Sequence, residues 1–180
     1  MIKPLQHSSL EIGTGIYDIF QKSYAVEAAL LNSDDFPPLK RSISAIQNST
    51  TSFYGYYNKQ QLCAVMELEI YSSHIHVRSL TVDPEYFRQG IGYTLLQFVI
   101  DEFRPSLITV ETGHGNHPAV KFYLNFGFKK DSFFMTDVGI EKISFTLRPW
   151  GSSHGIFDLK ICHSSPEIWS LTIKTLIMTN

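Results

Sequence analysis

Cysteine is scarce in this sequence, with Cys63 and Cys162 the only two among 180 residues. Two thiols so far apart give neither a disulfide framework nor the paired spacing of a structural zinc site. Such low cysteine usage is typical of proteins from reducing compartments, so we expect a cytoplasmic protein.

An excess of basic charge is also missing, because 15 Lys and Arg stand against 17 Asp and Glu, for a net charge of −2. Proteins that bind nucleic acids through phosphate contacts carry clustered basic residues, so we expect no nucleic-acid partner. No apolar run approaches the roughly 18 residues of a membrane helix. The first residues, MIKPLQHSSLEIG, lack the apolar centre of a signal peptide, so we expect no membrane association.

What is present suits one folded domain, with 43% hydrophobic and 13% aromatic residues. Apolar residues at helical spacing predict a helix over 10–32 and a short one after Pro37-Pro38. Three strand-like runs then follow, TSFYGYYN, QLCAVMELEIYSS and HIHVRSLTVDP, whose short polar connections favour an antiparallel meander. A helix, a strand, a second helix beginning at Asn116 and two more strands complete the order.

This order predicts an α+β fold with a mixed, mostly antiparallel sheet and one parallel β-α-β crossover. We expect residues 1–147 to form the domain and residues 148–180 to be a C-terminal extension of open role. Its end favours neither helix nor strand clearly. It is compatible with a cover for the sheet, a contact in a homodimer, a lid or partner-binding segment, or a non-native end.

The stretch RQGIG, Arg88 to Gly92, lies where a strand turns into a helix. Free N–H groups at a helix start, together with the helix dipole, form an anion site that needs no net basic charge. Gly90 and Gly92 are expected to let the backbone approach a bulky anion. Arg88 adds a donor at the rim. The stretch lacks both the GK[ST] ending of a P-loop and the GxGxxG of a dinucleotide fold.

Two signatures at this spacing resemble those of the GNAT superfamily of acetyl-CoA-dependent N-acetyltransferases. The first is VDP followed by FRQGIG, and the second is NHPAVKFYLNFGF. The second matches the family pattern at Asn116, Ala119, Phe122, Tyr123, Gly127 and Phe128. The first departs from it at Phe87, where the family usually has Gln or Arg. The resemblance covers roughly residues 2–147.

The resemblance implies a three-layer fold in which the strand before the turn carries a bulge and splays from the next strand. Acetyl-CoA would be the co-substrate, its pantetheine arm lying along the backbone of that strand and its pyrophosphate held by the turn. The cofactor-binding residues implied are Leu80, Thr81, Val82, Arg88, Gln89, Gly90, Ile91, Gly92, Tyr93, Asn116 and Tyr123.

The reaction implied is direct attack of a primary amine, on a small molecule or a protein N-terminus, on the thioester. Tyr123 occupies the position of the family's acid, and a phenol is a sensible proton donor to a thiolate. Glu111 lies where the ribosomal-protein alanine N-acetyltransferase branch, whose cofactor motifs are similar, has its base. Glu67 and Glu69 are rival bases. The alternative function is a non-catalytic acyl-CoA-binding or regulatory module.

Other features carry weaker hypotheses. His74 with His76, and His114 with His117, lack a third ligand at a diagnostic spacing, so we expect no metal. Cys63 lies in an apolar strand and is expected in the core. Acceptor-lining candidates are the aromatic group Phe53, Tyr54, Tyr56 and Tyr57 and the acidic pair Asp34-Asp35, and Asp83 is expected to cap the glycine turn.

Overall fold

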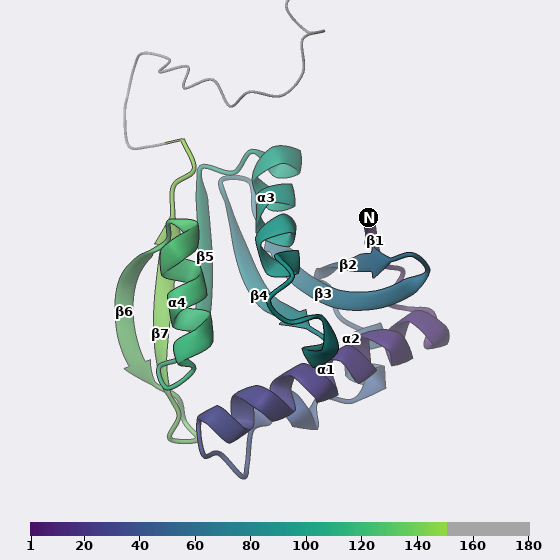
Figure 1. The fold of residues 1–180 in the computed structure, drawn as a ribbon, viewed down its shortest axis with the longest axis horizontal. Coiled ribbons are helices and arrows are strands. Elements are labelled where there is room, and N and C mark those ends of the chain that lie inside the picture. The colour runs from purple at the N-terminus through teal and green to yellow at the C-terminus, as the bar shows by residue number, and fades with distance from the viewer. Residues whose placement is uncertain (151–180) are drawn as a thin grey trace, which may run out of the picture.

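The computed structural model describes residues 1–150, and within them seven strands form one sheet in the order β1-β2-β3-β4-β5-β7-β6 (Figure 1). The strands are β1 (Ile2–Pro4), β2 (Ser52–Asn58), β3 (Gln61–Ile70), β4 (His74–Val82), β5 (Leu107–Gly113), β6 (Lys129–Met135) and β7 (Glu141–Leu147). In this described sheet β4 and β5 are parallel, and the other neighbours are antiparallel. The predicted α+β class and single crossover are therefore confirmed.

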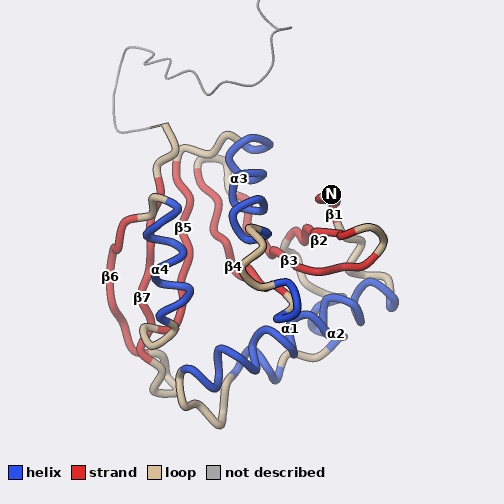
Figure 2. The backbone as a smooth tube through the Cα atoms, viewed as in Figure 1, coloured by secondary structure: helices blue, strands red, loops and turns tan. Residues whose placement is uncertain are grey.

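Helices cover both faces of the sheet and make it the middle of three layers (Figure 2). They are α1 (Leu10–Leu30), α2 (Ile43–Gln47), α3 (Ile91–Phe103) and α4 (His117–Phe126), with short 3-10 turns at Pro37–Lys40 and Pro84–Tyr86. The apolar stripe of α1 and Ile46 of α2 pack with Phe53 and Val65 on one face. Leu95 and Val99 of α3 and residues of α4 pack on the other face.

Strand β3 lies between these two cores, and all six residues from Cys63 to Leu68 are buried. A strand covered on both faces carries a continuous apolar run instead of an alternation of apolar and polar residues. Cys63 is a core residue, as predicted. Glu67 interrupts the apolar run and is completely buried.

Strand β4 contains the feature that opens the sheet. Glu67 pairs with Ser79 and Leu68 pairs with Val77, so Arg78 is an extra residue, a β-bulge. On the other side, the parallel register with β5 runs from His74 to Val77 and stops there. Figure 1 shows β4 and β5 side by side at one end and diverging at the other, where α1 crosses. The bulge and the splayed strand pair implied by the family resemblance are thus confirmed.

A few features differ from the predictions. Strand β1 is too short for a residue pattern to reveal it, and it forms because Ile2 to Pro4 pair with β2. The short helix predicted after Pro37-Pro38 is a 3-10 turn followed by the five-residue helix α2. All seven residues of the edge strand β6 are exposed. Most of the extension predicted for 148–180 lies outside the described residues.

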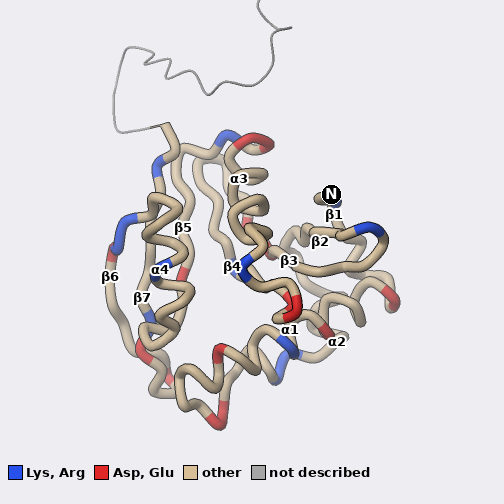
Figure 3. Tube along the Cα trace, viewed as in Figure 1, with Lys and Arg blue, Asp and Glu red and all other residues tan. Residues whose placement is uncertain are grey.

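Charged positions are distributed over both sides of the sheet (Figure 3). Among the described helices, none is both long enough and apolar enough to cross a membrane.

Candidate functional site

The connection from β4 to α3 presents a row of backbone N–H groups. Asp83 caps its first turn by accepting a hydrogen bond from the N–H of Glu85 at 3.1 Å, as predicted. Asp83 is also paired with Lys22 at 2.6 Å. The first backbone hydrogen bond of α3 runs from Thr94 N–H to the carbonyl of Gly90 at 3.0 Å. The N–H groups from Gly90 to Tyr93 therefore have no acceptor within their helix and are available to an anion.

The two glycines of this turn have different roles. Gly90 has a φ of +77°, a conformation that favours glycine, whereas no atom of residues 1–150 lies within 4 Å of an added Cβ, so the reason for glycine is conformation and not space. Gly92 is helical, and an added Cβ would lie 3.1 Å from Cζ of Phe122 in α4. Gly92 thus allows α3 to approach α4, while it also lines the cleft described next, and its approach to an anion stays a prediction.

A cleft of about 590 Å³ begins at this turn and follows β4. Its walls include every predicted cofactor residue except Gln89, whose side-chain amide donates to the carbonyl of Glu85 at 3.4 Å. The opposite wall is formed by α1, through Ser23, Val26 and Leu30. Phe87 also lines the cleft, at the position where the sequence departs from the family pattern.

A smaller hollow of about 120 Å³ lies in the opening between the splayed strands β4 and β5. It is bounded by Val77 to Leu80 of β4 and by Val110 to Gly113 of β5. The residues that line both the hollow and the cleft are Tyr24, Glu27, Leu80, Asn116, Ala119 and Tyr123. The two spaces are therefore neighbours, separated by shared side chains.

Tyr123 stands at this junction. It is only 5% exposed, and its ring packs against those of Phe128 and Phe145, each with a centroid separation of 5.5 Å. Among residues 1–150, its hydroxyl group makes no hydrogen bond, although the side chain borders both spaces. Burial raises the pKa of the Tyr123 phenol, and the negative charge of Glu27 raises it further. The phenol therefore keeps its proton at neutral pH.

Asn116 reaches the same junction from the start of α4. Its Oδ1 accepts a hydrogen bond from Ala119 N–H at 3.2 Å, which confirms the predicted N-cap. The side chain is 9% exposed and lines both spaces. Because the oxygen is engaged in capping, the amide nitrogen is the group that remains for a ligand.

The three carboxylates predicted as candidate bases lie in different environments. Glu111 is 36% exposed, lines the smaller hollow and lies 3.4 Å from Nζ of Lys142. Glu69 is paired with Arg78 at 2.6 Å. Glu67 is completely buried. Neither Glu67 nor Glu69 lines the cleft or the hollow, which favours Glu111 among the three.

Two functional candidates on α1 were missed by the sequence interpretation. The hydroxyl group of Tyr24 donates to Oγ of Ser79 at 2.7 Å, next to the bulge. Oε1 of Glu27 accepts from the hydroxyl group of Thr112 at 3.1 Å and from Gly113 N–H at 3.4 Å. Residues three apart lie on one face of a helix. The sequence signal for this site was therefore the carboxylate of Glu27 on the same face as the apolar position of Tyr24.

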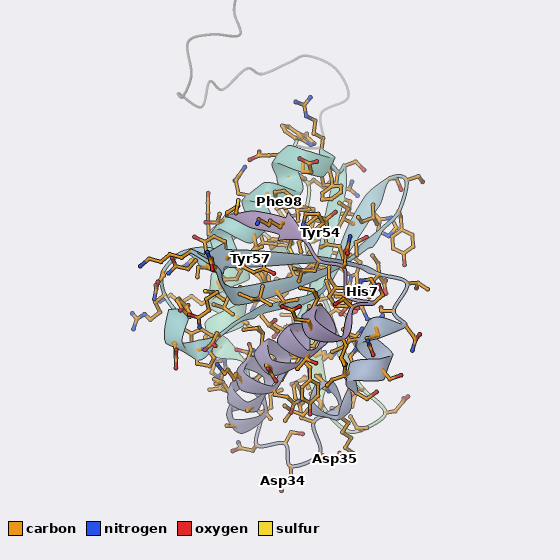
Figure 4. The ribbon with its side chains drawn as sticks, turned by 90° about the vertical axis from the view of Figure 1, so that its right-hand side faces the viewer. His7, Asp34, Asp35, Tyr54, Tyr57 and Phe98 are labelled. Atoms are coloured by element: carbon orange, nitrogen blue, oxygen red, sulfur yellow. The ribbon has the colours of Figure 1, made fainter. Side chains whose placement is uncertain are left out.

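Other predicted candidates are not part of this site. Figure 4 shows Asp34 and Asp35 at the lower end of the view, well below Tyr54. Both aspartates are exposed, and their loop reaches the hollow through Phe36 and Pro38 instead. The aromatic residues of β2 line neither space: Phe53 belongs to the core under α1, and Tyr54 packs on α3.

The histidine pairs have other partners. His114 Nδ1 lies 2.8 Å from Oε2 of Glu141, and His76 Nδ1 lies 2.9 Å from Oγ1 of Thr109. Within residues 1–150, no three His, Cys, Asp or Glu side chains gather as a set of metal ligands.

Comparison with known proteins identifies the family. The model of the acetyltransferase (GNAT) family matches residues 14–128. UPF0157 protein YqkA of Bacillus subtilis is 34% identical over 150 residues, which cover 83% of this chain and 44% of that protein. The chain thus spans less than half the length of this curated relative.

Solved structures share the fold at low sequence identity. The ribosomal-protein-S18-alanine N-acetyltransferase of Escherichia coli superimposes with a TM-score of 0.65 at 19% identity, covering 87% of this chain and 98% of that one. The PaiA N-acetyltransferase of Thermoplasma acidophilum, in complex with coenzyme A, gives 0.63 at 19% identity, covering 80% and 98%. Together with the family match, the sheet order, the bulge and the glycine turn lead to one conclusion: the chain belongs to the GNAT family of acetyltransferases.

Proposed function

We propose that this protein transfers an acetyl group from acetyl-CoA to a primary amine, on a small molecule or a protein N-terminus. The observation that carries this proposal is the junction at Tyr123, where a cleft with anion-binding N–H groups meets a hollow between two splayed strands. Family membership supports the reaction class. The coenzyme A complex of the Thermoplasma acidophilum protein supports the choice of donor.

The residues present fit acetyl-CoA. The N–H groups from Arg88 to Tyr93 would hold the pyrophosphate at the start of α3. Beyond Val77, no strand of residues 1–150 pairs with β4 on its β5 side, so its backbone from Leu80 to Val82 would offer hydrogen bonds to the amides of the pantetheine arm. The amide nitrogen of Asn116 would donate from the opposite wall. The cleft volume of about 590 Å³ lies within the usual range for small-molecule sites.

Tyr123 at the junction and Glu111 in the hollow would provide for both proton transfers. When bound, acetyl-CoA supplies an activated thioester carbonyl. As the bond from the amine nitrogen to the acetyl carbon forms and the carbon–sulfur bond breaks, Glu111 takes the amine proton, directly or through water. Tyr123 gives its phenol proton to the departing sulfur. Burial raises the pKa of this phenol, which makes it a weaker acid but keeps its proton available at neutral pH.

The test is a screen for release of free thiol from acetyl-CoA in the presence of polyamines, amino acids, aminoglycosides and peptides with free N-termini. We expect release that depends on at least one class of amine. Tight binding of coenzyme A without thiol release across the whole panel would instead indicate the non-catalytic acyl-CoA-binding or regulatory module.

A further inference from the structure

Glu27 has a carboxylate oxygen that finds no partner among residues 1–150, on a side chain at the junction of the two spaces. Its Oε1 accepts both hydrogen bonds that reach the side chain, from Thr112 and from Gly113 N–H. Among residues 1–150, no donor reaches Oε2. That oxygen is not sealed in the protein, because no buried side-chain oxygen of the described chain lacks a partner. It is therefore exposed, on a side chain that lines both spaces.

The charge of Glu27 is also not neutralised by the nearby cations. Arg78 pairs with Glu69 at 2.6 Å and lies 3.7 Å from Glu67. Lys142 pairs with Glu111. Within the described chain, the partners of Glu27 are a hydroxyl group and a backbone N–H, both neutral. The hollow thus holds one carboxylate that lacks a counter-ion, a group that favours a bound cation.

The negative charge of this carboxylate acts on both phenols of the junction. Burial is the main cause of the raised pKa of Tyr123, and the charge of Glu27 comes second. The pKa of Tyr24 is also raised chiefly by burial, and Glu27 again contributes. Glu27 and Tyr123 both line the hollow, and among residues 1–150 neither Oε2 of Glu27 nor the hydroxyl group of Tyr123 has a hydrogen-bond partner.

We propose that Glu27 binds the ammonium group of the acceptor before proton removal, and that it selects primary amines that are cationic at neutral pH. This inference rests on the proposed function and specifies its substrate class. A charge-assisted hydrogen bond from the ammonium group to Oε2 would hold the amine nitrogen beside Tyr123. Leu31 and Phe36 line the same hollow and would contact the carbon chain of the acceptor.

Glu27 also joins α1 to the end of β5, so the test must separate charge from structure. In Glu27→Gln, the side-chain oxygen still accepts from Thr112 and Gly113 N–H, and only the negative charge is removed. Glu27→Asp keeps the charge on a shorter side chain. Glu11→Gln removes a carboxylate from an exposed position in the first turn of the same helix and is the matched control.

The experiment measures binding of n-butylamine and of its uncharged counterpart 1-butanol by calorimetry, with coenzyme A present. We expect the wild-type chain and Glu11→Gln to prefer the amine. Glu27→Gln should reduce that preference by about tenfold or more, the size of one charge-assisted hydrogen bond. Glu27→Asp should retain part of the preference, and the thermal unfolding temperature should not change in Glu27→Gln.

Two results would overturn the inference: a wild-type chain that binds both ligands equally, or a preference for the amine that survives in Glu27→Gln. Direct binding keeps this test apart from the test of the proposed function. A chain that binds the amine through Glu27 but releases no thiol would contradict the transferase reaction and leave the cation site standing. If the wild-type chain releases thiol and Glu27→Gln has an unchanged KM for the amine, the transferase reaction would stand. The role of Glu27 in binding the amine would then be contradicted.

Discussion

Arg41 holds the buried carboxylate of Glu67 with both terminal nitrogens of its guanidinium group, at 2.6 and 3.0 Å. The same carboxylate accepts hydrogen bonds from the hydroxyl groups of Thr51 at 2.6 Å and Ser79 at 3.3 Å. The guanidinium group lies over the rings of Phe20 and Phe53. This arrangement ties the segment before α2 to the sheet directly beside the bulge of β4.

Replacing Arg41 with Met should destabilise the protein, because it removes the bidentate partner of the buried Glu67 charge and leaves Arg78, 3.7 Å away, as the remaining cation of the described chain near it. The expected loss is about 3–5 kcal/mol in the free energy of unfolding, measured by urea denaturation. Adding Glu67→Gln to this variant should recover part of the loss, since no buried charge then remains. A single variant as stable as the wild-type chain would show that the pair contributes little.

Removing the hydroxyl group of Tyr123 should slow turnover without weakening the binding of coenzyme A. We expect Tyr123→Phe to lower kcat by about a hundredfold or more, the usual contribution of a general acid. Because burial raises the pKa of this phenol, its deprotonation should cause no decline of activity below about pH 10, the ordinary range of tyrosine. Tyr54→Phe, outside the site, serves as control, and an unchanged kcat in Tyr123→Phe would remove this residue from the mechanism.

Neutralising Glu111 should change the pH dependence of the reaction. In Glu111→Gln we expect kcat/KM to fall by about a hundredfold near neutral pH, where an alkyl amine is mostly protonated. The loss should shrink towards high pH, where the free amine is abundant. Glu102→Gln, an exposed carboxylate of α3, is the control. A rate profile of wild-type shape would indicate that water, or another group, accepts the proton.

Substitution of Gly90 should act through backbone conformation. Gly90→Ala places a side chain at a φ of +77°, so we expect a loss of about 1 kcal/mol in stability and weaker binding of coenzyme A. Gly90→Asn should be milder, because asparagine tolerates this conformation better. Thermal unfolding and calorimetric titration with coenzyme A measure both effects, and equal behaviour of the two variants would argue against a conformational cause.

The prediction of the fold succeeded where patterns are local. The helix over 10–32, the meander and the cap at Asn116 each follow from spacing or from residue chemistry within a few positions, and the structure confirms them. Strand β1 depends on pairing with β2, far along the chain, and its three residues carry no pattern of their own. The burial of Glu67 was likewise missed, because Arg41 reaches it from a different element.

The candidate site was predictable in its cofactor half, since the motifs around Gly90 and Asn116 are contiguous stretches that line one cleft. The acceptor half was not. Glu27 becomes significant only because α1 crosses the opening between β4 and β5, a relationship set by tertiary packing. The acidic pair Asp34-Asp35 had the expected chemistry but lies outside the hollow.

The extra residue in β4 also changes which side chains of that strand point to each face of the sheet. Ile75 and Val77 face the core beneath α3, and simple alternation would direct Ser79 to the same side. Because Arg78 adds one position, Leu80 and Val82 continue that side, while Ser79 turns to meet Tyr24 of α1. Strand β4 thus directs side chains to the helix layers on both faces of the sheet. A shift by a single residue determines which of these side chains border the junction.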